Sequence, residues 1–334
     1  MSVSLTMWLI TIGAILVLVV MDFLTVSRKP HEVAFKEAAI WSIFYIAIAI
    51  AFGVFIWVWQ GSDFGTQYFA AYLVEKSLSV DNLFVFVIIL AQFAVPSIYH
   101  QRVLLVGVVL ALVLRAIFIA VGAAALAAFS FTFVIFGAIL IWTGVQLFRH
   151  RDADPEPKDN LVVRTVRRWY PVTPDYHDTK LFVRIDGRRM ITPLMLVMVA
   201  IASTDLLFAL DSIPATFGVT QEPYLVFTAN AAALLGLRAL YFLLKGLLSK
   251  LIYLSLGLSI ILVFIGVKLI LTFAHEVNND IPKIPTVFSL GVIAAILIIV
   301  TIASWIKVRK DPTATAHAGT VTKPKSHEGE TPES

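Results

Sequence analysis

Long apolar runs divide the chain and leave few folds open to it. Nine runs of mostly apolar residues follow one another, at about 6–26, 38–60, 67–92, 103–126, 129–148, 191–216, 224–244, 251–273 and 286–306. A membrane-spanning helix needs about 20 such residues. A spanning backbone must also satisfy its own hydrogen bonds, which leaves helices or closed barrels. Because the runs are long and lack strand-like alternation, we predict an all-α polytopic membrane protein with about nine transmembrane helices.

The composition agrees with this reading and excludes thiol chemistry. The chain is 59% hydrophobic and 14% charged, whereas soluble proteins are about 45–50% apolar and about 25% charged. It has no cysteine, so disulfides, thiolate metal sites and cysteine catalysis are excluded. Basic residues such as Arg28 and Lys29 follow the first run and none precedes it. We therefore expect a retained first helix and not a cleaved signal peptide.

The distribution of basic residues predicts the orientation. Ten Lys and Arg residues lie between 149 and 190, and others lie in the first, third and seventh connections, whereas the even-numbered connections hold only Lys283. Basic loops stay in the cytoplasm. Nine spans with the N-terminus outside and the C-terminus in the cytoplasm fit this asymmetry.

The same runs predict the domain organisation. Asp186-Gly187 lies between two apolar stretches and is typical of a tight hairpin turn, and the polar C-terminal segment has a disordered composition. The loop and the tail are the segments that could dock protein partners. The predicted units are 1–62 (two N-terminal helices), 63–148 (first three-helix repeat), 149–190 (cytoplasmic loop with hairpin), 191–273 (second three-helix repeat), 274–310 (ninth helix) and 311–334 (tail).

An internal repeat is the most informative feature of the sequence. "EKSLSVDNLF" (75–84) resembles "DLLFALDSIP" (205–214), and "LVLRAIF" (112–118) resembles "LGLRALY" (235–241). Each unit holds three spans (3–5 and 6–8), so the second enters the membrane from the opposite side. Inverted repeats with polar residues near midplane are typical of secondary transporters. The repeat pairs Glu75 with Asp205, Asp81 with Asp211, Asn82 with Ser212 and Arg115 with Arg238.

These intramembrane polar residues predict a site for a divalent cation. A charge at the bilayer centre costs about 2.5–3.5 kcal/mol on insertion scales, so repeated carboxylates favour function over purely structural ion pairs. Their oxygen atoms suit hard cations such as Mn²⁺, Mg²⁺ and Ca²⁺, and no histidine lies within a span to favour zinc or copper. The predicted metal ligands are Glu75, Asp81, Asn82, Asp205, Asp211 and Ser212. The predicted charge-balancing or coupling residues are Arg115, Arg238, Lys76 and Asp22.

The spacing also predicts how the carboxylates are arranged. Six helical residues turn about 240°, so Glu75 and Asp81 do not share a face. Either the helix unwinds at 77–79 or the carboxylates form two layers. The inverted repeat then predicts Glu75 level with Asp211, and Asp81 level with Asp205. Pro214 is expected to end or kink its helix. Clustered carboxylates that exchange metal for protons would make an antiporter.

At these residues the sequence resembles the TerC family of bacterial inner-membrane proteins, within the lysine-exporter superfamily. The blocks that carry the resemblance include "EKSLSVDNLFVF" (75–86), "YPVTPDYHDTKLFVRIDGRRMITPL" (170–194) and "STDLLFALDSIPA" (203–215). The resemblance implies manganese export and metal homeostasis in a family named after tellurium resistance. It also implies that Glu75, Asp81, Asn82, Asp205 and Asp211 stand at the family's acidic motifs.

Two other functions remain open. One is export of a small organic or amino-acid solute, and the other is a membrane scaffold that supplies metal to partner proteins. The sequence holds no nucleophile–base arrangement, phosphate loop or haem pair, so we do not expect an enzyme. We expect no tightly bound cofactor and no nucleic-acid partner, only the transported cation, protons and the lipid bilayer.

Overall fold

The computed structural model is almost entirely helical. It describes residues 3–27, 33–150, 161–185, 188–244, 250–278, 280–282 and 284–311, without the side chains of residues 25–27, 81, 161 and 244. The elements in this part of the chain are α1 (Leu5–Ser27), α2 (Phe35–Gln60), α3 (Ser62–Gln92), α4 (Ser97–Ala128), α5 (Thr132–Arg149), α6 (Leu161–Trp169), β1 (Phe182–Ile185), β2 (Arg188–Ile191), α7 (Pro193–Phe217), α8 (Pro223–Leu235), α9 (Leu237–Leu244), α10 (Leu254–Val277) and α11 (Thr286–Lys310).

Eight helical stretches in the described residues are long and apolar enough to cross a membrane, and each coincides with a predicted span. They are α1, α2, α4, α5, α7, α10, α11 and the stretch Pro223–Leu243 made by α8 and α9. The remaining predicted span, 67–92, lies in α3, which has 31 residues and is about 46 Å long. It carries Asp63, Glu75, Lys76 and Asp81. The chain is an all-α polytopic membrane protein.

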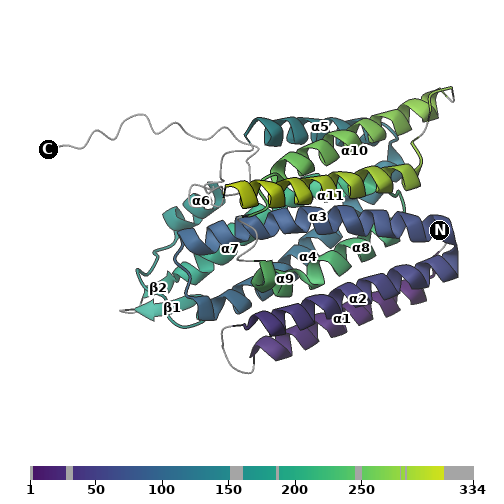
Figure 1. Ribbon diagram of the computed structural model, residues 1–334. Helices are drawn as coiled ribbons and strands as arrows, with labels where there is room; N and C mark the ends of the chain where they lie inside the picture. The colour runs from purple at the N-terminus through teal and green to yellow at the C-terminus, as the bar shows by residue number, and fades with distance from the viewer. Residues whose placement is uncertain are drawn as a thin grey trace.

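The helices form a bundle in which α3, α4, α7 and α8 lie between two outer groups (Figure 1). α1 and α2 cover one side, and α5, α10 and α11 cover the other (Figure 1). Within the bundle α3 packs on α8, α4 on α7, and α5 on α10. The stretch formed by α8 and α9 is the most buried of the eight, whereas α1 and α11 are the least buried. Exposed apolar side chains such as Leu9 and Ile299 lie on these outer helices, as expected of a lipid-facing surface.

Glycines bring α5 and α10 into close contact. A Cβ atom on Gly137 would lie 2.7 Å from the carbonyl oxygen of Gly266, and one on Gly266 would lie 2.7 Å from that of Gly137. A Cβ atom on Gly144 would lie 2.8 Å from the carbonyl oxygen of Ser259. Small residues that let two backbones approach are characteristic of helix packing in membranes. This pair therefore forms a tightly packed side of the bundle.

A small polar module lies at the end of the bundle where α11 ends, opposite the N-terminus (Figure 1). The predicted hairpin is confirmed by the antiparallel pair β1–β2, in which Phe182 faces Ile191 and Ile185 faces Arg188. Its turn, Asp186-Gly187, is outside the described residues, as is the predicted tail from 312 on. The short helix α6 was not predicted; it buries Val163 against the main apolar core.

Candidate functional site

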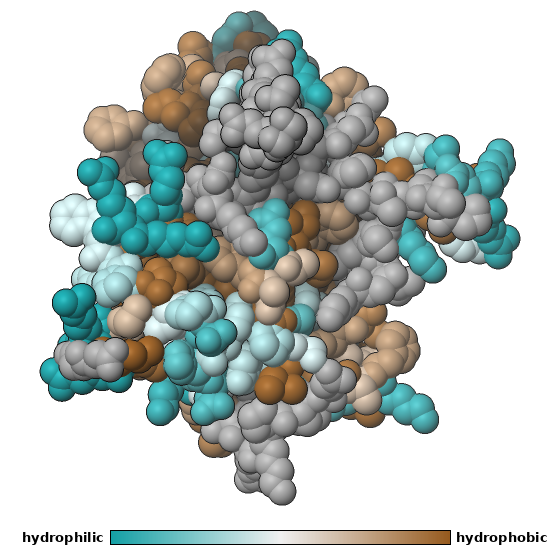
Figure 2. Space-filling model, turned by 90° about the vertical axis from the view of Figure 1, so that its left-hand side faces the viewer, coloured by the Kyte–Doolittle hydropathy of each residue, from teal (hydrophilic) through white to brown (hydrophobic). Residues whose placement is uncertain are grey.

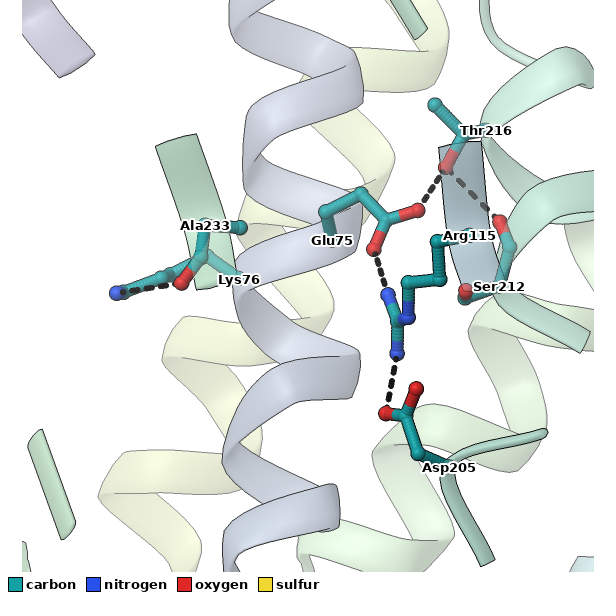
Figure 3. Close-up of polar contacts among 7 residues, drawn as sticks. All are labelled: Glu75, Lys76, Arg115, Asp205, Ser212, Thr216 and Ala233. Atoms are coloured by element: carbon teal, nitrogen blue, oxygen red, sulfur yellow. Dashed lines mark hydrogen bonds and ion pairs between the residues drawn. The ribbon is translucent and has the colours of Figure 1, made fainter. Parts of the chain in front are cut away.

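Helix α3 presents its charged residues to two different sides. It is helical from Ser62 to Gln92, so the predicted alternative of unwinding at 77–79 is wrong. Glu75 points towards α4 and α7, whereas Lys76 points away from them towards α8 (Figure 3). Adjacent helical residues diverge by about 100°. The two charges of "EKSLSVDNLF" therefore belong to different groups of contacts.

Arg115 lies at the centre of the first group. It comes from α4 and is fully buried. Its Nη1 donates to Glu75 Oε2 at 2.8 Å, and its Nη2 lies 3.4 Å from Asp205 Oδ1. One guanidinium thus joins carboxylates from α3 and α7, the first helices of the two predicted repeats (Figure 3). Such a planar fork of donors suits two carboxylates, which a lysine could not bridge in the same way.

Further polar side chains complete the group around Arg115. With the Asn82 amide oriented to satisfy its hydrogen bonds, its oxygen accepts from Arg115 Nη2 at 3.0 Å and its nitrogen donates to the Leu78 carbonyl at 3.0 Å. The Thr216 hydroxyl lies 2.6 Å from Glu75 Oε1 and 2.9 Å from the Ser212 carbonyl oxygen (Figure 3). Each of these residues is almost fully buried. Hydrogen bonds among buried polar groups of this kind are strengthened by the low-dielectric surroundings.

Three buried oxygen atoms near this network have no hydrogen-bond partner in the described part of the chain: Asp205 Oδ2, Ser79 Oγ and Ser212 Oγ. Buried polar atoms are normally paired, so each such exception requires an explanation. Glu75 and Asp205 also carry one more formal charge than Arg115 neutralises. The group can therefore accept a cation, because it has oxygen atoms without a hydrogen-bond partner and an excess of negative charge.

Glu75 and Asp211 are predicted at the same level, which stays a prediction, and the structure gives the two carboxylates different partners. Thr143 of α5 donates to Asp211 Oδ1 at 2.8 Å, so Asp211 faces α5 and Asp205 faces Arg115. Six residues separate these two carboxylates, and a helix turns them to different faces. Glu75 lies instead beside Thr216, one turn beyond Ser212. The side chain of Asp81 is outside the described residues, so its predicted pairing with Asp205 stays a prediction.

Arg238 and Asp22 form a second ion pair. Arg238 Nε donates to Asp22 Oδ2 at 3.1 Å, and Nη2 donates to Asp22 Oδ1. Both residues are buried. The pair joins α9 to α1. Repeat-related arginines are therefore both paired with carboxylates, but Arg238 takes one from outside the predicted repeats.

Lys76 has a local role that the sequence did not reveal. Its Nζ lies 3.4 Å from the carbonyl oxygen of Ala233 in the last turn of α8, where the predicted span 224–244 is interrupted at Gly236. The last carbonyls of a helix lack intrahelical partners, and a cation there also complements the helix dipole. Lys76 therefore stabilises the end of α8.

The predicted carboxylate cluster is only partly assembled. In the residues that the structure describes, no three His, Asp or Glu side chains converge as metal ligands. Glu75, Asn82, Asp205 and Ser212 lie around Arg115, whereas Asp211 lies at Thr143. Two residues were missed, Thr216 and Thr143. Thr216 follows Ser212 by four residues, which places both on one helix face, so the signal was present.

Comparison with known proteins places these features in a family. The model of the "Integral membrane protein TerC family" matches residues 60–312. An uncharacterized membrane protein of Myxococcus xanthus is 42% identical over 312 residues, which cover 93% of this chain and 96% of that protein. One of Mycobacterium tuberculosis is 44% identical over 319 residues, or 91% and 80% of the two chains.

A third relative carries a more specific name. The "Putative membrane-bound redox modulator Alx" of Escherichia coli is 36% identical over 305 residues, which cover 88% of this chain and 93% of that protein. No solved structure matches the chain.

Proposed function

Because the chain belongs to the TerC family of integral membrane proteins, we propose that it is a secondary transporter that exports divalent metal cations, with Mn²⁺ as the favoured substrate. The observation that carries the proposal is the buried group of Glu75, Arg115 and Asp205, with its unpartnered oxygen atoms and excess negative charge. The atoms of this group that could bind a metal are all oxygens, which suit hard divalent cations. The preference for manganese comes from the family resemblance.

In the proposed mechanism Arg115 and the cation compete for the same carboxylates. Without metal, Arg115 neutralises one of the two formal charges of Glu75 and Asp205. An entering cation takes those carboxylates, with oxygen atoms of Asn82, Ser79 and Ser212 as further ligands. Arg115 must then turn away, and the attraction between metal and carboxylates offsets the loss of the ion pairs. Asp81 and Asp211 are the carboxylates through which the metal approaches and leaves.

The packing of the helices supports an inverted repeat around this site. Exchange of α3 with α7, α4 with α8 and α5 with α10 converts the contact α3–α8 into α4–α7 and the reverse, and converts α5–α10 into itself. A two-fold relation between the units would have this result. Rocking of one repeat against the other around a midplane site is the usual route to alternating access. We propose the bacterial inner membrane as the location, with α6 and the hairpin on the cytoplasmic side.

Transport by purified protein in liposomes tests the function. Asp205→Asn should lower the rate of Mn²⁺ transport more than about tenfold, since losing even an outer-shell partner typically costs 10–100-fold in metal affinity. Asp63→Asn is the matched control, because it removes the same charge from an exposed position in the first turn of α3. Equal rates for both variants and the parent would remove Asp205 from the site.

Proton coupling has its own test. If inward proton flow drives metal out, raising the pH outside should slow export, because it removes the protons that exchange with the metal. The measurement is Mn²⁺ flux in liposomes at fixed internal and varied external pH, with the membrane potential clamped. Rates that do not depend on the proton gradient would leave metal transport in place and reject the antiport mechanism.

One observation favours a second substrate class. Arg115 beside Glu75 and Asp205 places both signs of charge in one buried group, as a zwitterionic amino acid would require. The same liposomes with radiolabelled amino acids separate the two substrates, and a scaffold would move neither.

The name "redox modulator" belongs to the relative from Escherichia coli. This chain has no cysteine, so it cannot take part in thiol–disulfide exchange.

A further inference from the structure

An open groove lies at the end of the bundle that carries α6 and the hairpin. Its volume is about 360 Å³. Its walls are the last residues of α3, the first residues of α7, one arginine of α6 and the segment that precedes β1; the main lining residues are Phe93, Arg167, Thr173, Tyr176, Pro193 and Leu196. Polar and apolar groups are therefore both present. The groove differs from the buried Arg115 group, because it is open and its lining includes the guanidinium of Arg167.

The position of the groove corresponds to the depth of lipid headgroups. Two of its walls are the points where α3 ends and the spanning helix α7 begins. A helix that spans the hydrocarbon core ends at the headgroup region. The apolar wall residues Phe93 and Leu196 are themselves buried, so the side chain of the groove that would meet a lipid headgroup is the exposed Arg167.

Contacts with the bundle fix the groove in shape. Val163 of α6 is buried in the main apolar core, and Val166 packs against it. The guanidinium of Arg167 lies 5.9 Å from the centre of the Phe93 ring. Tyr176 donates its hydroxyl hydrogen to the Phe93 carbonyl at 2.7 Å, and burial raises the pKa of this hydroxyl to about 12, so it stays protonated. Arg167 is thus held at the groove and not on a free loop.

The surroundings of the groove are strongly basic. Seven Lys and Arg residues and two Asp residues lie in the described part of 161–191. Arg164, Arg168, Arg188 and Arg189 are exposed and make no ion pair with the described residues. Trp169 and Tyr170, which directly follow Arg168, are 76% and 56% exposed. Exposed aromatic residues beside basic ones are typical of segments at the membrane interface. Figure 2 views this end, where hydrophilic side chains project around apolar patches.

The start of α7 lies at the same groove. The side chain of its N-cap residue, Thr192, donates to the Lys180 carbonyl at 2.8 Å and does not cap the helix. The positive end of the helix dipole, at Pro193, therefore faces the groove without a side-chain acceptor. Anions are stabilised at such a position, and a guanidinium binds phosphate in a bidentate manner.

We propose that this groove binds the phosphate headgroup of an anionic phospholipid from the surrounding membrane, with Arg167 as the principal contact and Trp169 and Tyr170 at the interface. The exposed arginines of α6 and the hairpin raise the local concentration of anionic lipid. Bound lipid would tie α6 to the ends of α3 and α7. This assignment does not depend on the proposed transport function.

Lipid retention tests the proposal. The full chain, purified in detergent, is mixed with phosphatidylglycerol or with phosphatidylcholine, and bound lipid is measured by native mass spectrometry. The parent protein should retain phosphatidylglycerol in preference. Arg167→Gln should weaken this retention about fivefold, which corresponds to about 1 kcal/mol per basic residue near an anionic membrane surface. Arg167→Lys should keep a large part of it.

Arg168→Gln is the matched control, because it removes the same charge from the next residue of α6, which does not line the groove. It should weaken retention clearly less than Arg167→Gln does, because its guanidinium does not line the groove. Equal loss in the two glutamine variants, or equal retention of the two lipids, would overturn the proposal. Displacement of the lipid by millimolar inorganic phosphate or by an acidic peptide would also overturn it, in favour of a soluble anion or an acidic protein. An unchanged melting temperature of Arg167→Gln would confirm that the variant is folded.

Discussion

Replacing Arg115 with glutamine is expected to lower the free energy of unfolding by about 3–5 kcal/mol, because the change leaves two buried carboxylates without their cation. Arg115 is fully buried and contacts both Glu75 and Asp205. Because Glu75 and Asp205 are also buried, solvent does not screen the charges that remain. The loss should exceed that of any exposed substitution on the same helix. Equilibrium unfolding in mixed detergent micelles measures it.

Two further variants make this prediction specific. Arg102→Gln removes an arginine from an exposed position of α4 and should change stability by less than about 0.5 kcal/mol. Adding Glu75→Gln and Asp205→Asn to Arg115→Gln removes the uncompensated charges and should restore much of the stability. If Arg115→Gln alone is as stable as the parent, then Arg115 does not neutralise these carboxylates in the folded protein.

Replacing Arg238 with glutamine is the second change with a large expected effect. Asp22 would lose its two hydrogen bonds to the guanidinium and stay buried between α1 and α9. The expected loss is again about 3–5 kcal/mol. The same unfolding measurement applies, and Asp22→Asn in the Arg238→Gln background should recover part of the loss.

Combining the two arginine changes tests whether the ion pairs are separate. Arg115 pairs with Glu75 and Asp205, whereas Arg238 pairs with Asp22, and independent sites add within about 0.3–0.5 kcal/mol. The double variant should therefore lose the sum of the two single losses. A strongly non-additive result would indicate that all these charges belong to one coupled network. Transport should respond chiefly to the Arg115 group.

Some features of the site could be read from the sequence and others could not. The paired segments at 75–84 and 205–214 identified Glu75 and Asp205 as candidate residues, and both form ion pairs with Arg115. Their mutual arrangement was not predictable, because helix periodicity gives the direction of a side chain relative to its own helix only. Which neighbour occupies that direction depends on packing. Asp211 accordingly accepts a hydrogen bond from Thr143 of α5, a contact that periodicity did not indicate.

Lys76 shows the same limit. In the sequence it was a charge without a counterpart, since the matching position of the second segment is Leu206. Its role depends on the interruption of the helical stretch at Gly236, which exposes the Ala233 carbonyl at the end of α8. An isolated glycine in an apolar run does not by itself indicate a break. Only the approach of α3 to α8 places an ammonium group at that carbonyl.

The sequence by itself determined the class of protein, the spans and the hairpin at 182–191. These follow from local physics, because the cost of exposing backbone to lipid imposes helices on any long apolar run, and Asp-Gly favours a tight turn. The tertiary structure decided which charges meet. One arginine with its long side chain joins carboxylates from two helices, and another joins Asp22. Such contacts depend on distances between helices far apart in the chain, and no local pattern encodes them.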